Sequence, residues 1–313
     1  MTSRRCRSLC VVASALAVVG VLQTVGLVLS PELSAAPVPP GLKQWETREF
    51  PIAPGVKMVF CWVPPGTAQL GSPKTEQDFL TRTEFDGKRP IWMDDENEAT
   101  RGLYRSKGFW LGKYEVTQGE WTAVLKVDNP SYFDGRNDNK AKGMQTSHFP
   151  VENVSWDDSQ GFLKALNERG GAAAMFGGVG RFTLPHEDEW EYAYRGGKGN
   201  GRAFYWGDDL NGDKANCDGN HPYGGAAKGP YLERTAAVGS YETKAPHPWG
   251  LCDMAGNVWE WCDNNYKQSD DYCVIRGGSW GDLARLCRAA YRNDFTPVSR
   301  FNCNGFRVCF RLD

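Results

Sequence analysis

The side chains of this sequence best suited to chemistry are its cysteine thiols, because a thiolate can act as a nucleophile or bind a soft metal ion. Eight cysteines follow residue 36, namely Cys61, Cys217, Cys252, Cys262, Cys273, Cys287, Cys303 and Cys309. Their spacing contains no Cys-x-x-Cys pair and the four histidines are scattered, so a zinc site is unsupported. An even number of cysteines favours disulfides if the chain is exported, although some of the eight can equally be buried and free.

Short motifs rich in tryptophan, glycine and arginine are spread along the sequence. They read GKYEVT at 112–117, PVENVSW at 150–156, EWEYA at 189–193, NVWEW at 257–261, GGSW at 277–280, CRAAYR at 287–292 and GFRV at 305–308. In this order they resemble the formylglycine-generating enzyme family, also called the sulfatase-modifying factor family, from near Met58 to the C-terminus. The resemblance implies an α+β fold related to C-type lectins, with little regular secondary structure.

The resemblance implies an oxidase chemistry that needs two cysteine thiolates, and this sequence has only one cysteine at the corresponding place. Oxidases of the family convert a sulfatase cysteine to formylglycine with oxygen and a copper(I) ion, which two thiolates bind shortly after the GGS turn. Here the corresponding interval has one cysteine, Cys287, and Asp282 cannot replace a thiolate for copper(I). We therefore expect no oxidase activity, and a disulfide of Cys287 with Cys303 or Cys309. The alternative is a rearranged oxidase in which Cys287 and Cys303 or Cys309 bind copper.

The resemblance also implies a calcium site built from side-chain and main-chain oxygens. The corresponding positions here are Asp253, Gly256, Val258 and Glu260. Two carboxylates and two carbonyls suit Ca2+, which oxygen ligands bind at about 2.3–2.6 Å. We expect calcium there; the alternative is that Glu260 caps a loop or pairs with an arginine. A second family site would start at Asn216, but Pro230 replaces its usual aspartate, so we expect an empty or carbonyl-only loop.

The tail, residues 276–313, also resembles the variable segment of lectin-like proteins that retroelements diversify. Those proteins keep motifs such as GGSW and GFRV as a scaffold while the intervening positions vary; the alternative is plain divergence within the family. The candidates for ligand contact are the loop residues Trp280, Asp282, Asn293, Asp294, Phe295 and Phe301. The expected ligand is a protein, a peptide or a glycan, and a sulfatase is one candidate partner.

Local patterns predict the strands and loops that position these residues. Apolar strands are expected at 56–63 and 109–116, with a short strand at 150–154. The stretch 198–256 is rich in glycine, proline and aspartate and has little periodicity, which indicates long ordered loops. Few helices, short strands and much irregular chain agree with the fold that the resemblance implies.

Three helices are predicted from their N-terminal residues. Helices after Thr117 and Ser155 each have an acid three positions after the cap, which is typical of a capping box. A third helix begins near Glu187, where acids in the first turn favour the helix dipole. Gly196 and Gly197 then end this helix.

The N-terminal segment is typical of an export signal. Basic residues precede an apolar run at 11–29, and small residues follow at 34–36. We expect a signal peptide over 1–36 and export to the periplasm, the cell surface or the medium; an uncleaved membrane anchor is the alternative. The proline-containing stretch 37–43 then connects to a single domain over 44–313.

The overall charge excludes one class of partner. Charged residues make up 24% of the chain and the formal net charge is -2, so there is no basic field for nucleic acid. The sequence therefore predicts an exported, single-domain binding or accessory protein that uses its C-terminal loop face. The alternative is a formylglycine-generating oxidase that uses copper and oxygen.

Overall fold

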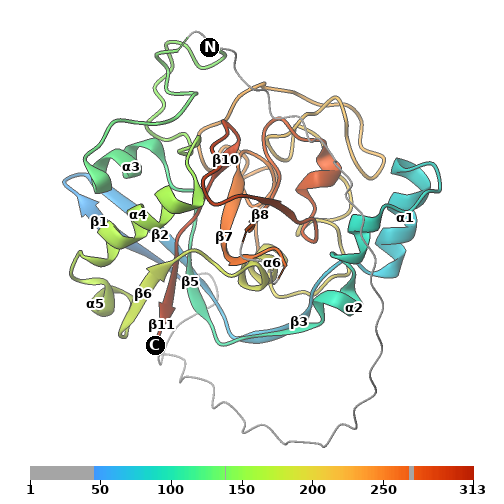
Figure 1. Ribbon diagram of the computed structural model, residues 1–313, viewed down its shortest axis with the longest axis horizontal. Helices are drawn as coiled ribbons and strands as arrows, with labels where there is room; N and C mark the ends of the chain where they lie inside the picture. The colour runs from blue at the N-terminus through green and yellow to red at the C-terminus, as the bar shows by residue number, and fades with distance from the viewer. Residues whose placement is uncertain (1–45, 138, 268–270) are drawn as a thin grey trace, which may run out of the picture.

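The structure, a computed structural model, describes residues 46–137, 139–267 and 271–313. Its largest sheet has five strands in the order β1-β2-β5-β11-β6, and every neighbouring pair is antiparallel. These strands are β1 (Thr47–Ala53), β2 (Val56–Val63), β5 (Phe109–Gly112), β11 (Cys309–Leu312) and β6 (Gly180–Thr183). The C-terminal strand therefore lies inside this sheet, between strands from much earlier in the sequence (Figure 1).

A second sheet lies near the centre of the molecule and has the strand order β10-β7-β8-β9 (Figure 1). Its strands are β10 (Asn304–Gly305), β7 (Trp259–Asn265), β8 (Cys273–Arg276) and β9 (Asn293–Phe295). β10 runs parallel to β7, and the other two pairs are antiparallel. β3 (Gly66–Gln69) and β4 (Leu103–Ser106) form a separate pair. The chain from Cys273 onward therefore supplies strands to both larger sheets.

Helices cover the sheets on separate sides of the molecule. They are α1 (Lys74–Glu84), α2 (Glu98–Arg101), α3 (Gln118–Leu125), α4 (Trp156–Asn167), α5 (Ala172–Phe176) and α6 (Glu187–Tyr194), with 3-10 turns η1 (Ile91–Asp94) and η2 (Ala284–Cys287). α3, α4 and α5 contact strands of the five-stranded sheet, whereas α6 contacts β7 and β8. Figure 1 shows α1 at the opposite end of the molecule from α3, α4 and α5.

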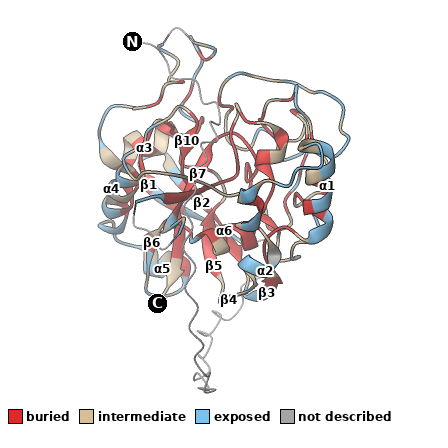
Figure 2. Cartoon of the chain, turned by 45° about the vertical axis from the view of Figure 1, so that its right-hand side comes forward, coloured by how far each residue is buried: buried red, intermediate tan, exposed pale blue. Residues whose placement is uncertain are grey.

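The core consists of two apolar clusters, and β2 contributes to both. Phe60 and Trp62 pack in the cluster that contains the apolar residues of α4, whereas Cys61 and Val63 pack in the other. Successive side chains of a strand point to opposite faces, so β2 is buried on both. This burial explains why 56–63 reads as a continuous apolar run. Figure 2 shows the buried residues concentrated in the central strands.

The three predicted helix starts are confirmed. Thr117 and Ser155 cap α3 and α4, and each forms the expected capping box. α6 begins at Glu187, with His186 as its cap. Gly196 and Gly197 follow its last turn with φ of 57° and 70°, a conformation that glycine adopts without a steric cost.

The predicted strand at 56–63 is confirmed as β2, but the other two strand predictions need correction. β5 ends at Gly112 instead of residue 116, because Glu115 turns into the core and accepts hydrogen bonds there. The stretch 150–154 forms one isolated bridge, at Pro150, and no strand. Between α6 and β7 the described chain has only isolated bridges, as the composition of 198–256 predicted.

The predicted signal peptide at 1–36 and linker at 37–43 lie outside the described residues. Within the part of the chain that the structure describes, no helix combines the length and the apolar character needed to cross a bilayer. Export therefore stays a prediction.

Candidate functional site

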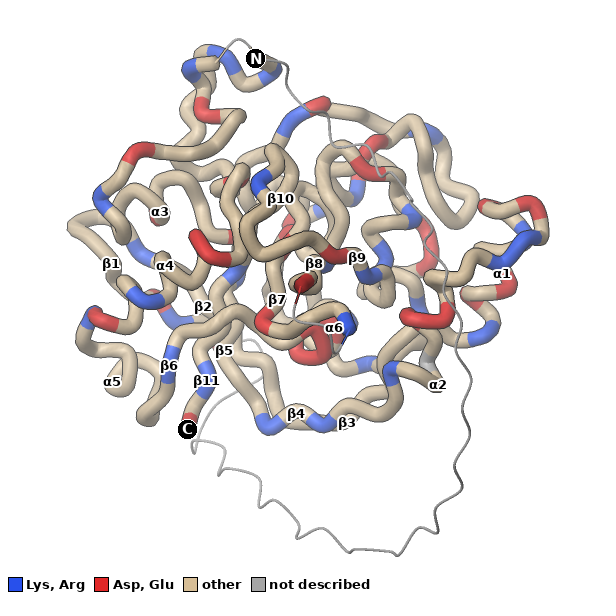
Figure 3. Tube along the Cα trace, in the orientation of Figure 1, with Lys and Arg blue, Asp and Glu red and all other residues tan. Residues whose placement is uncertain are grey.

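Three arginines of the tail motifs are buried and tie the tail to earlier parts of the chain. The pairs are Arg276 with Glu191, Arg288 with Glu76 and Glu96, and Arg307 with Glu260. Figure 3 shows the acidic stretch of α6 beside β8, the strand that ends at Arg276. Removing one partner of a buried pair leaves an uncompensated charge, so these arginines fix the position of the tail.

The GGS turn closes directly over Cys287. Gly277 and Gly278 have φ of 97° and 73°, which favours glycine at both positions. A Cβ atom on Gly278 would lie 2.6 Å from the Cys287 sulfur. No substrate group fits between this turn and the thiol.

Cys287 is a free thiol with an exposed fraction of 0%. A hydrogen bond with the Cys217 thiol, together with burial, raises the pKa of Cys287 well above its usual value. Cys309 is also free, so the disulfide predicted for Cys287 is wrong. The reason is that Cys287 lies under the GGS turn against Cys217.

The contact between Cys217 and Cys287 arises from a backbone hydrogen bond that the sequence did not indicate. The Asp218 N–H donates to the Asp282 carbonyl at 2.9 Å, which lays the chain around Cys217 against the segment after GGSW. Both thiols are free and buried. Copper(I) binds thiolates, and the raised pKa of Cys287 opposes formation of the thiolate. Among the described residues, no group of three or more His, Cys, Asp or Glu side chains is arranged to hold a metal ion.

Glu260, a predicted calcium ligand, forms a two-point ion pair with Arg307. The Arg307 Nε lies 2.6 Å from Glu260 Oε2, and Nη2 lies 2.6 Å from Oε1. The indole Nε1 of Trp190 also donates to Oε2 at 2.7 Å. From the sequence, pairing of Glu260 with an arginine was the alternative to calcium binding, and Glu260 has such a pairing.

Two further buried carboxyl groups, Asp253 and Glu115, lie near this ion pair. The Gly239 N–H donates to Asp253 Oδ2 at 2.5 Å, and Asn257 Nδ2 donates to Glu115 Oε2 at 2.7 Å. Burial is the main cause that raises the pKa of Asp253 to about 6, and the Glu260 carboxylate adds to it. Burial and the carboxylates of Asp253 and Glu260 raise the pKa of Glu115 well above its usual value.

The predicted calcium ligands fit a cation in part. Three carboxyl groups, those of Glu115, Asp253 and Glu260, share the single guanidinium of Arg307, which leaves negative charge to be compensated. Glu260 gives both oxygens to Arg307, and Glu115 accepts from Asn257 and Val258 with its two oxygens, so Asp253 is the carboxyl group left for a cation. Gly256 and Val258 lie on the same turn: Gly256 N–H bonds the Gly277 carbonyl and Val258 N–H bonds Glu115.

Asn216, the start of the second family calcium position, makes structural contacts. Its Nδ2 donates to the Arg234 carbonyl and to Asn257 Oδ1, each at 3.0 Å. Its Oδ1 has no hydrogen-bond partner among the described residues. The side chain therefore joins the loop at 234 to the NVWEW motif.

Five of the six predicted ligand contacts are half-buried, and three of these, Trp280, Phe295 and Phe301, lie close together. Trp280 Nε1 donates to the Asn302 carbonyl at 2.9 Å, and the ring centroids of Phe301 and Phe295 are 4.7 Å apart. All five residues are half-buried, and the exposed Val298 lies between Phe295 and Phe301 in the sequence. We call the region formed by these five residues and Val298 the tail face; its residues are Trp280, Asn293, Asp294, Phe295, Val298 and Phe301.

Asp282, the sixth predicted contact, is buried, so its prediction as a ligand contact needs correction. Its carboxylate accepts a hydrogen bond from Ser279 Oγ at 2.5 Å, and burial raises its pKa to about 6. The side chain therefore shapes the turn after GGSW and is not exposed to a ligand.

Several buried acids were not recognised from the sequence. Glu115 lies in the predicted strand 109–116, which begins with the apolar residues Phe109, Trp110 and Leu111; Glu76 and Glu96 lie in segments without a comparable pattern. Their partner Arg288 belongs to CRAAYR, but the pairing joins residues about 200 positions apart in the sequence. No local pattern could have indicated that pairing.

Residues 49–312 match the protein family described as "Sulfatase-modifying factor enzyme 1-like domain". The formylglycine-generating enzyme of Streptomyces coelicolor is 35% identical over 186 residues, which cover 52% of this chain and 53% of that protein. The inactive C-alpha-formylglycine-generating enzyme 2 of Bos taurus is 32% identical over 166 residues, which cover 51% of this chain and 49% of that protein. The chain thus spans about half the length of these curated relatives.

A solved structure has the same fold. The structure of Treponema denticola variable protein 1 matches with a TM-score of 0.60 and 23% sequence identity, over 85% of this chain and 99% of that chain. The predicted α+β fold related to C-type lectins is thereby confirmed, with the variable protein as a relative in fold.

Proposed function

This chain belongs to the sulfatase-modifying factor enzyme 1-like domain family, and from that premise we propose that it is an exported binding or accessory protein without oxidase activity. One observation carries the proposal: the interval between the GGS turn and Ala289 holds a single cysteine, and that thiol is buried under Gly278. An oxidase of the family needs two thiolates that a peptide substrate can reach. Buried arginines hold the same interval as a scaffold.

The tail face is the surface through which this protein binds its ligand. Its half-buried aromatic rings combine apolar area with polar neighbours on β9, a composition typical of recognition surfaces. Val298 exposes 62% of its surface at the centre of the loop, where it stabilises no core. The ligand class is a protein, a peptide or a glycan, and a sulfatase is the candidate partner among proteins.

A matched pair of valine variants tests this surface. Val298→Glu places a charge on the tail face, whereas Val179→Glu places one on a valine that is 70% exposed beside the C-terminal residue. Both variants should fold like the wild type, since neither valine is buried. On peptide and glycan arrays, and with a purified sulfatase, Val298→Glu should lose the signals that wild type and Val179→Glu share. Equal signals from all three proteins would rule out the tail face.

Calcium is a second part of this proposal. The surplus of buried carboxyl groups around Arg307 supports a bound cation, which would neutralise Asp253. A cation there would stabilise the turn that carries Gly256 and Val258, and with it the start of β7. Its role is structural, because this cluster shares no residue with the tail face.

A formylglycine-generating oxidase is the alternative function, and the contact between Cys217 and Cys287 is the observation in its favour. Two adjacent thiols are the donor set that copper(I) prefers. Both thiols are buried, however, and the GGS turn lies directly over Cys287. Oxidase activity would therefore require this turn to open.

A further inference from the structure

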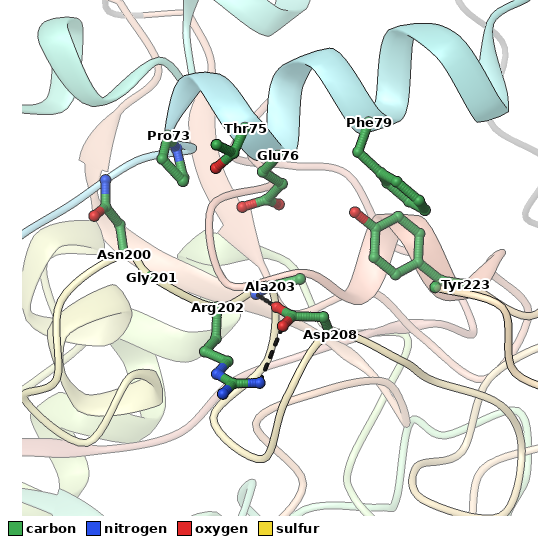
Figure 4. A pocket seen from close by; sticks show the side chains of 11 residues that line it. Pro73, Thr75, Glu76, Phe79, Asn200, Gly201, Arg202, Ala203, Asp208 and Tyr223 are labelled. Atoms are coloured by element: carbon green, nitrogen blue, oxygen red, sulfur yellow. Dashed lines mark hydrogen bonds and ion pairs between the residues drawn. The ribbon is translucent and has the colours of Figure 1, made fainter.

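A cavity of about 290 Å3 lies between α1 and two loops (Figure 4). The residues that line it are Pro73, Thr75, Glu76 and Phe79 of the α1 segment, Asn200, Gly201, Arg202, Ala203 and Asp208 of the first loop, and Tyr223 and Gly224 of the second. None of them belongs to the tail face or to the carboxyl cluster around Arg307. The cavity is therefore a separate candidate site.

The inner wall of this cavity carries a carboxylate that is only half satisfied. Glu76 Oε1 accepts a hydrogen bond from Arg288 Nη1 at 2.6 Å, while Oε2 has no partner among the described residues. The Glu76 side chain is 8% exposed, and Figure 4 shows it pointing from α1 toward the loop of Arg202 and Asp208. A buried oxygen without a donor is costly, so a ligand that donates to it is favoured.

The charge on this wall is negative. Arg288 is shared between Glu76 and Glu96, whose carboxylate also accepts from it at 3.0 Å, so two acids face one guanidinium. Asp208 also lines the cavity, but it pairs with Arg202 at 3.1 Å with both side chains more than half exposed, so this pair adds no net charge. An anionic ligand would meet these carboxylates, whereas a cation would compensate them.

Aromatic rings form the remaining wall. Phe79 and Tyr223 pack edge to face with their centroids 5.3 Å apart, and both line the cavity. Aromatic faces attract cations and cover apolar groups. The volume corresponds to roughly ten water molecules, which matches a ligand of about ten non-hydrogen atoms.

We propose that this cavity binds a small organic cation with a protonated amine, whose ammonium group donates to Glu76 Oε2 and whose apolar part packs against Phe79 and Tyr223. The hydrogen bond joins two ionised groups and is therefore of the strong kind. The inference is independent of the tail face, so either can fail without the other.

Phenethylammonium is the probe for this site, and 2-phenylethanol is its uncharged counterpart of nearly equal shape. Titrations of the purified full-length chain, followed by calorimetry, should show phenethylammonium binding at least about tenfold more tightly than the alcohol. Glu76→Gln should weaken phenethylammonium binding by a similar factor, because it removes the charge while Arg288 keeps Glu96. Asp78→Asn is the matched control: it removes a carboxylate from the same helix that does not line the cavity, and should change nothing.

A second variant keeps the test valid if Glu76→Gln fails to fold. Thr75 is exposed on α1 and lines the cavity, so Thr75→Phe should fill the space and abolish binding without touching Arg288. Absence of phenethylammonium binding to the wild type would overturn the proposal. Equal affinity for the alcohol, or binding unchanged in Thr75→Phe, would also overturn it.

Discussion

Arg307 and Glu260 form a fully buried ion pair in which two nitrogens of one side chain meet two oxygens of the other, each at 2.6 Å. The pair joins the GFRV motif to NVWEW, next to the parallel contact of β10 with β7. The two motifs are more than 40 positions apart in the sequence, and the buried ion pair holds them side by side because a buried charge needs a partner.

Replacing Arg307 should destabilise the protein strongly. Arg307→Met leaves Glu260 buried without its partner beside Asp253 and Glu115, for which we expect a loss of about 3–5 kcal/mol in the free energy of unfolding. Urea denaturation measures this loss. Arg300→Met is the control, because Arg300 pairs with Asp158 at a side-chain exposure of 48% and should cost at most about 1 kcal/mol. Equal losses in both variants would contradict the role of burial.

Asp253 should make stability fall as pH rises. Its pKa is raised to about 6, above the value of about 3.9 for an unfolded chain, so the folded state holds a proton that the unfolded state releases. In the presence of a chelator, the contribution of Asp253 is favourable below about pH 4 and is lost as pH rises through about 6. Asp253→Asn should flatten this part of the curve of stability against pH. A variant with the wild-type slope would show that another group is responsible.

Calcium removal should lower the melting temperature at neutral pH. A cation at a hundredfold excess over its dissociation constant stabilises the folded state by about 2.7 kcal/mol, and chelation removes that term. Asp253→Ala should make the melting temperature insensitive to chelator, whereas Asp128→Ala, at an exposed position, should behave like the wild type. If chelator leaves the wild type unchanged, the calcium site is ruled out.

The GGS turn should tolerate no side chain at Gly278. Gly278→Ala places a Cβ atom 2.6 Å from the Cys287 sulfur at a φ of 73°, so we expect a loss of about 1–3 kcal/mol or more. Gly281→Ala is the matched control three positions on, since its Cβ atom would meet nothing within 4 Å and should change stability by about 0.5 kcal/mol or less. Thermal unfolding of both variants measures the difference. A stable Gly278→Ala variant would mean that the turn does not close over the thiol.

Cys287 should resist alkylation in the native protein. Its exposed fraction is 0%, and the hydrogen bond with Cys217 and burial raise its pKa, so little thiolate is present or accessible. Peptide mapping after iodoacetamide treatment should find Cys287 modified only in urea. Rapid modification under native conditions would show that the GGS turn opens.

The elements that were predicted correctly are those that depend on residues close together in the sequence. The capping boxes at Thr117 and Ser155 use residues three positions apart, and both form as expected. The strand predicted to 116 stops at Gly112 because a distant partner, Asn257, holds Glu115 in the core.

The candidate site was less predictable because its contacts join distant segments. The family motifs predicted calcium at Asp253 and Glu260, which stays a prediction, and left pairing of Glu260 with an arginine as the alternative, without indicating that Arg307 is the partner. Spacing along the chain also could not show that Cys287 meets Cys217. Asp282 was predicted to be an exposed ligand contact because it is an acid in a loop. The hydrogen bond from Ser279 that holds it in the interior could not be predicted from the sequence.

The most direct test of the central claim is an assay for aldehyde formation. Purified protein is incubated with copper, oxygen, a reductant and a cysteine-containing sulfatase peptide, and the peptide is analysed by mass spectrometry. We predict that the cysteine stays unmodified, since the one thiol between the GGS turn and Ala289 is buried under Gly278. Conversion of the peptide cysteine to an aldehyde, lost in Cys287→Ser, would contradict a binding role without oxidase activity.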